Sequence, residues 1–113
     1  MADYITINTM PGTWVVRAGG AVLAETNGAL ELKEGDLDPV VYFPRDDIAM
    51  AFLDESTTQT HCPHKGDATY FSIHTKSTII EDAGWSYEAP VEAVTKIKGY
   101  LAFYTHKVTV EQL

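Results

Sequence analysis

Cysteine and basic residues are scarce in this sequence, and each scarcity excludes a class of protein. The 113 residues include one cysteine, Cys62, which can neither form an intrachain disulfide nor supply the cysteine pairs of a zinc knuckle. Eight Lys and Arg residues against sixteen Asp and Glu residues give a formal net charge of -8. This charge opposes nonspecific binding to nucleic-acid phosphates and to anionic membranes, so we expect neither as a partner.

Long apolar runs are also missing. No segment is long enough for the apolar part of a signal peptide or for a membrane span, and no Lys or Arg precedes Arg17. We therefore expect a cytoplasmic protein. At 113 residues and 45% hydrophobic composition, the chain has the length and the apolar content of one globular domain, predicted over residues 1–113.

Glycine and proline divide the chain into short segments, and this spacing favours strands over helices. A hairpin is predicted over residues 13–25, because Gly19 and Gly20 can supply the positive φ angles of a tight turn. Residues 48–53 are apolar at almost every position, and we favour a strand there over a helical turn. Further strands are predicted at residues 40–43, 56–62, 68–75 and 78–82, with a closing hairpin at 100–104 and 107–110.

One short α-helix is predicted near residues 90–98. Pro90 suits the first helical position, apolar residues follow at 91, 94 and 97, and Gly99 can end the helix. About eight short strands with one short helix indicate a mainly β, antiparallel domain. Periodicity alone leaves sandwich, barrel and tent architectures open.

The segment 58–67 carries the densest set of reactive side chains. Lys65 and a protonated neighbour could lower the pKa of Cys62 and make its thiolate a nucleophile. Alternatively, Cys62 is a small buried hydrophobic residue on a strand. A metal site of His61, Cys62 and His64 is disfavoured, because neighbouring residues on a strand point to opposite faces.

Arg45 follows a predicted strand and a proline. With Lys65 it could form a small positive pocket that holds a carboxylate or phosphate. The alternative is that Arg45 pairs with Asp46, Asp47 or another internal carboxylate and fixes its own loop.

The segment 82–88 has the composition of a binding loop. Asp82 supplies a carboxylate, and Trp85 and Tyr87 could pack against a planar or apolar ligand and orient it with their N–H and O–H groups. Alternatively, the two aromatic side chains cover the core beneath a loop.

Known phosphate-binding motifs are missing. Gly19-Gly20 followed by Asp36 and Asp38 imitates the glycines and acids of nucleotidyltransferases, but no helix pattern separates them and Pro39 interrupts the strand. Neither a GxxxxGKS/T nor a GxSxG element is present. We therefore expect the two aspartates to form a turn, and we expect no cofactor.

Four segments in this order resemble a bacterial and fungal family, domain of unknown function 427, over about residues 13–110. They are residues 42–47 (YFPRDD), 60–66 (THCPHKG), 82–87 (DAGWSY) and 99–104 (GYLAFY). The resemblance implies a β-tent fold, similar to methionine sulfoxide reductase B and cereblon-like domains. It implies no reaction, and the two cysteine pairs that commonly hold zinc in those relatives are missing. The family signature falls on Arg45, Cys62, Lys65, Gly66, Asp82, Trp85 and Tyr87.

Two functions follow as hypotheses. The first is a small-molecule site, for binding or for catalysis, in which Arg45 and Lys65 hold an anion and Cys62 or Asp82 acts as nucleophile or base. The residues expected to line it are Tyr42, Arg45, Thr60, Cys62, Lys65, Gly66, Tyr70, Asp82, Trp85 and Tyr87. The second is a non-catalytic interaction or structural module that engages another protein or a second copy of the chain.

Overall fold

Three antiparallel β-sheets build the structure, a computed structural model that describes residues 4–113. Residues 1–3 of the predicted domain lie outside the described residues. The sheets have the strand orders β1-β4-β5, β10-β2-β3 and β6-β7-β8-β9, which confirms the mainly β prediction. The strands are β1 (Ile5–Thr9), β2 (Trp14–Ala18), β3 (Ala21–Thr26), β4 (Leu30–Glu34), β5 (Val40–Tyr42), β6 (Leu53–Cys62), β7 (Gly66–His74), β8 (Ile79–Tyr87), β9 (Leu101–Phe103) and β10 (Thr109–Gln112).

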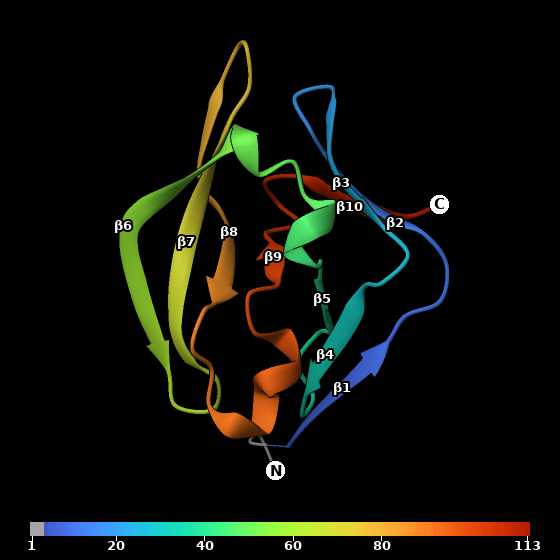
Figure 1. Ribbon diagram of the computed structural model, residues 1–113, viewed down its shortest axis with the longest axis vertical. Helices are drawn as coiled ribbons and strands as arrows, with labels where there is room; N and C mark the ends of the chain where they lie inside the picture. Colours follow the sequence, from blue (N-terminus) through green and yellow to red (C-terminus); the bar gives the residue numbers. More distant parts are fainter. Residues whose placement is uncertain (1–3) are drawn as a thin grey trace.

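The sheets form two walls that face each other. Figure 1 shows β6, β7 and β8 on one side and β1, β2, β3, β4 and β10 on the other, with β5 and β9 between them. The walls are joined where Phe43 and Leu101 exchange backbone hydrogen bonds of 2.8 and 3.0 Å. Two clusters of buried side chains fill the interior, one around Phe43 and Phe103 and one around Tyr42. The β-tent likeness itself stays a prediction.

The first hairpin is confirmed. β2 and β3 pair around a two-residue turn, in which Gly19 and Gly20 have φ angles of 55° and 80°. Residues with a Cβ atom rarely adopt such backbone angles, so the turn itself accounts for this glycine pair.

The strand predicted at residues 48–53 is wrong over most of its length. Ile48 makes one isolated bridge to Ala24, and the chain then turns through a 3-10 helix, η2 (Met50–Phe52), before β6 begins at Leu53. Another 3-10 turn, η1 (Arg45–Asp47), precedes it. The apolar run therefore carries the chain between the walls, and Phe52 at its end is exposed.

The predicted α-helix is also wrong. Its place is taken by a 3-10 segment, η3 (Glu92–Ile97), in which Val94 departs from helical geometry with φ -120° and ψ 27°. Apolar residues at 91, 94 and 97 repeat every three residues, which is the 3-10 period and not the α-helical one. Val94 and Ile97 are buried, whereas Val91 is exposed.

The closing hairpin does not form. β9 pairs with β8, and β10 pairs with β2 in a different sheet. One edge of β9 is occupied by β8 and the other meets Phe43, so no edge is open to β10. The turn after Tyr104 instead carries the chain from one sheet to the next.

The predicted binding loop at 82–88 lies almost entirely inside a strand. β8 extends to Tyr87, and Trp85 is paired with Tyr70 on one side and Ala102 on the other. The side chains of this segment are therefore held by a sheet. β1 and β4, which pair with each other, have no counterpart among the predicted strands.

A substitution at Gly84 tests how closely β8 packs against β9. A Cβ atom there would lie 2.9 Å from the Ala102 carbonyl oxygen and 3.0 Å from the Phe103 ring. We expect Gly84→Ala to lower the free energy of unfolding by about 1–3 kcal/mol in urea titrations. Gly28→Ala is the control, because its nearest atom would lie at 3.6 Å. Equal stability of the two variants would contradict the close packing.

Candidate functional site

Two adjoining cavities lie where the walls meet, between the β4–β5 loop and the side chains of β8 and the turn after β9. Their volumes are about 240 and 220 Å³. They share Asp38, Val40, Trp85 and Tyr104, so we describe them together as the aromatic groove. The remaining lining residues are Leu32, Glu34, Leu37, Pro39, Val41, Tyr42, Lys65, Tyr70, Tyr87, Phe103, Thr105, His106 and Val110.

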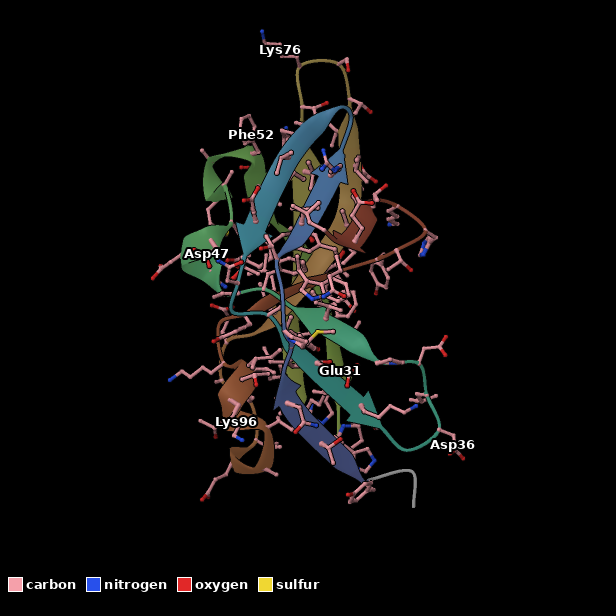
Figure 2. The ribbon with its side chains drawn as sticks, turned by 90° about the vertical axis from the view of Figure 1, so that its right-hand side faces the viewer. Glu31, Asp36, Asp47, Phe52, Lys76 and Lys96 are labelled. Carbon is pink, nitrogen blue, oxygen red and sulfur yellow. The ribbon has the colours of Figure 1, made fainter. Side chains whose placement is uncertain are left out.

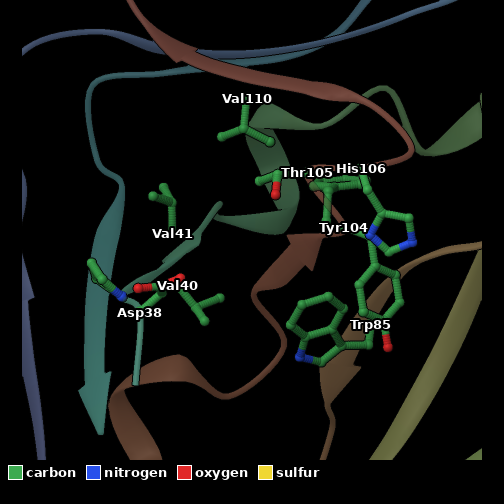
Figure 3. Close-up of a pocket in the computed structure, with 10 residues that line it drawn as sticks. Asp38, Val40, Val41, Trp85, Tyr104, Thr105, His106 and Val110 are labelled. Atoms are coloured by element: carbon green, nitrogen blue, oxygen red, sulfur yellow. The ribbon is translucent and has the colours of Figure 1, made fainter. Parts of the chain in front are cut away.

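Trp85 and Tyr104 form one wall of the groove. Figure 3 shows their rings across from Asp38 and Val40, with His106 beside Tyr104. The ring centroids of Trp85 and Tyr104 are 4.6 Å apart, with the rings inclined at 44°. Tyr42 meets Trp85 edge to face at 6.5 Å and accepts a 3.2 Å hydrogen bond from the indole N–H. These contacts fix the indole in one orientation.

Hydroxyl groups form a second feature of the groove. Tyr104 donates to the Tyr70 hydroxyl at 3.5 Å, and Tyr70 and Thr60 share a 3.0 Å hydrogen bond. Thr60 therefore does not line the groove but is hydrogen-bonded to a residue that does. The groove thus offers aromatic carbon together with hydroxyl groups that donate and accept hydrogen bonds.

Three tyrosines of the groove, Tyr42, Tyr87 and Tyr104, hold their hydroxyl protons more tightly than a free tyrosine does. Burial raises the pKa of Tyr42 and of Tyr87 above the usual range, and raises the pKa of Tyr104 to about 12. A tyrosine acting as base or nucleophile would need the opposite shift. These hydroxyls are therefore suited to hydrogen bonding and not to proton abstraction.

Lys65 lines the groove but is already paired. Its Nζ lies 2.5 Å from Glu34 Oε1, and both side chains are mostly buried, at 13% and 12% exposure. The pair ties the turn after β6 to the end of β4. Because breaking a buried ion pair leaves an uncompensated charge, Lys65 is not free to hold an anion alone.

Arg45 lies away from the groove. It donates through Nε to the Gly99 carbonyl oxygen at 3.0 Å and through Nη2 to Glu88 at 2.5 Å, and its guanidinium lies 5.5 Å from the Phe71 ring centroid. Pairing with an internal carboxylate was the alternative left open by the sequence. The structure therefore does not bring Arg45 and Lys65 into one positive pocket.

Cys62 and Gly66 lie behind the groove and do not line it. Cys62 is half-buried at the end of β6 and packs on the cluster around Tyr42. Gly66 has φ 117°, and a Cβ atom there would meet the Ala89 oxygen and Pro90 at 3.4 Å. Gly66 thus serves the turn between β6 and β7.

Asp82 also lies outside the groove. It adopts a left-handed φ of 47°, and its carboxylate accepts hydrogen bonds from Ser56 at 2.6 Å and Thr58 at 2.7 Å. These hydroxyls lower its pKa. A carboxylate held in this way is a weaker base, and its contacts fasten β8 to β6.

The structure thus gathers five of the ten predicted site residues, Tyr42, Lys65, Tyr70, Trp85 and Tyr87, around one groove. It adds Glu34, Asp38, Val40, Tyr104 and His106, which the site prediction did not include. Tyr104 belongs to the GYLAFY segment, so a signal for it was present. Nothing local in the sequence identifies Glu34 as the partner of a residue 31 positions away.

Between residues 4 and 113, no three His, Cys, Asp or Glu side chains gather closely enough to hold a metal ion. None of the helices in this part of the chain is long and apolar enough to cross a membrane.

The raised pKa values of three tyrosines predict that the fold loses stability at alkaline pH. A pKa raised by folding stabilises the native state below the unfolded pKa of about 10, and this stabilisation is lost as the pH rises. We expect Tyr42, Tyr87 and Tyr104 to ionise only as the protein unfolds. Absorbance of tyrosinate at 295 nm, with circular dichroism in parallel, measures both events. Ionisation of every tyrosine near pH 10 in the folded protein would contradict it.

The lowered pKa of Asp82 predicts that its contribution to stability is lost at acid pH. Its lowered pKa stabilises the native state above the unfolded value of about 3.9, and this contribution is lost as the pH falls through the folded pKa. Asp82→Asn keeps a side chain that tolerates the left-handed backbone. We expect it to be less stable than wild type at pH 7, with the difference shrinking below about pH 4. A pH-independent difference in urea titrations would rule out the carboxylate as its cause.

Comparison with known proteins identifies the family but no function. No curated protein matches the chain. A family model described as a domain of unknown function (DUF427) matches residues 6–112, which is nearly the whole sequence. The chain therefore belongs to the DUF427 family, as its signature segments predicted.

Proposed function

We propose that this domain binds a small organic molecule in the aromatic groove. The observation that carries the proposal is the convergence of Trp85 and Tyr104, fixed by their neighbours, with Asp38 and Val40 on the opposite side of two adjoining cavities. Ligand sites are concave and mostly apolar, with a few placed polar groups. The ring faces would pack on the body of the ligand, and the hydroxyl of Tyr70 or Tyr104 would orient it.

The proposal does not include a reaction. Cys62 and Asp82, the side chains suggested as nucleophile and base, lie outside the lining, and the raised pKa values of Tyr42, Tyr87 and Tyr104 keep their hydroxyls protonated. The remaining groups support recognition: aromatic faces, hydroxyls and a buried ion pair. An interaction module that engages a protein or a second copy stays the alternative, with the same residues serving as an internal network.

Blocking the groove tests the proposal. We expect an NMR screen of small ring-containing fragments to give hits that shift the Trp85 indole N–H signal and leave that of Trp14 unchanged, because Trp14 lies in β2 outside the groove. Val40→Phe adds volume inside the groove and should weaken these hits by about tenfold or more. Val22→Phe, on the exposed side of β3, is the matched control.

Two outcomes would refute the proposed site. One is a screen in which no fragment shifts the Trp85 signal. The other is a set of hits that bind Val40→Phe as well as they bind the Val22→Phe control, because those hits would occupy another surface.

A further inference from the structure

Among the residues that the structure describes, the groove has one carboxylate without an ion-pair partner, whereas its lysine is paired. Of the charged residues in the lining, Lys65 and Glu34 neutralise each other at 2.5 Å. Asp38, exposed in the β4–β5 loop, lines both cavities, and no Lys, Arg or His among residues 4–113 forms an ion pair with it. Lys33 of the same neighbourhood donates to the Leu37 carbonyl oxygen instead. An unpaired carboxylate at a concave surface attracts cations.

The aromatic wall suits the same kind of ligand. An ammonium group is attracted to the face of an aromatic ring, most strongly to tryptophan. Tyr104 of the lining already makes this kind of contact, since Lys107 Nζ lies 5.5 Å from its ring centroid while it donates to the Glu81 carbonyl oxygen. Figure 3 places Trp85 across the cavity from Asp38, so one ligand could contact the indole and the carboxylate together.

We infer that the groove recognises an alkylammonium cation, a positively charged nitrogen that carries methyl or methylene groups. The inference rests on the proposed function and adds the ligand class to it. The alkyl groups would pack on Trp85 and Val40, and the charge would lie near Asp38. The net charge of -8 would raise the local concentration of such a ligand. Anions are disfavoured, because Arg45 and Lys65 are each paired with a carboxylate.

A pair of probes of nearly equal shape tests the charge. Choline carries a quaternary ammonium, and 3,3-dimethylbutan-1-ol replaces that nitrogen with carbon. In NMR titrations of the Trp85 indole signal, we expect choline to bind about tenfold more tightly than the alcohol. Equal binding, or tighter binding of the alcohol, overturns the cation class and leaves the small-molecule proposal standing. If neither probe binds while neutral ring fragments do, the cation class is also overturned. If the fragments fail to bind as well, the proposed function is refuted.

Two aspartates of the β4–β5 loop distinguish a direct contact between Asp38 and the cation from the general attraction of an acidic surface. We expect Asp38→Asn to weaken choline binding severalfold and to leave the alcohol unchanged. Asp36→Asn removes the same charge from a residue outside the lining, which Figure 2 shows at the outer edge of the loop, and should have little effect. Equal losses in the two variants would overturn the assigned contact.

The source of the cation is distinguished by a third titration. A short peptide with trimethyllysine presents the same head group as choline on a polypeptide. Tighter binding of the peptide than of choline would indicate a modified protein as the source, and tighter binding of choline would indicate a free metabolite. Either result supports the ligand class only if the peptide with unmodified norleucine in place of trimethyllysine binds more weakly than its parent.

Discussion

The two backbone hydrogen bonds between Phe43 and Leu101 are the constraint on which the rest of the structure depends. They join the sheet that contains β5 to the sheet that contains β9, and so fix the distance between the two walls. The groove is lined by residues from both of the strands next to this junction. Val40 and Val41 come from β5, Phe103 ends β9, and Tyr104 follows it. A cavity of this kind exists only because short strands from distant parts of the chain end at the same place.

The few basic residues of this acidic protein serve as ties between elements. Lys65 connects the turn after β6 to Glu34 at the end of β4, Arg45 connects η1 to Glu88 and to the Gly99 carbonyl, and Lys107 connects the last turn to the backbone of β8. A mostly buried cation needs such a partner. These cations are therefore bound to groups of the protein itself, while carboxylates such as Asp38 remain available at the surface of the groove.

Sequence predictions were more accurate where they depend on local backbone conformation than where they depend on pairing between distant parts of the chain. The hairpin at Gly19-Gly20 depends on local backbone conformation, and it was predicted correctly. The segment ending at Tyr87 has loop-like composition, yet pairing with β7 and β9 makes it a strand. The apolar residues at 91, 94 and 97 fit a helical face, but their spacing of three suits a 3-10 turn. The closing hairpin failed because β2 offered β10 a free edge and β9 did not.

The sequence by itself determined the mainly β class, the DUF427 membership and the aromatic character of the candidate site, because composition, turn residues and signature segments are local properties. It also named five of the residues that line the groove. Only the tertiary structure decided that Arg45, Cys62 and Asp82 lie elsewhere, and that Glu34 neutralises Lys65. The physical reason is that charge pairing and cavity lining depend on residues far apart in the chain, which meet only after the sheets have closed.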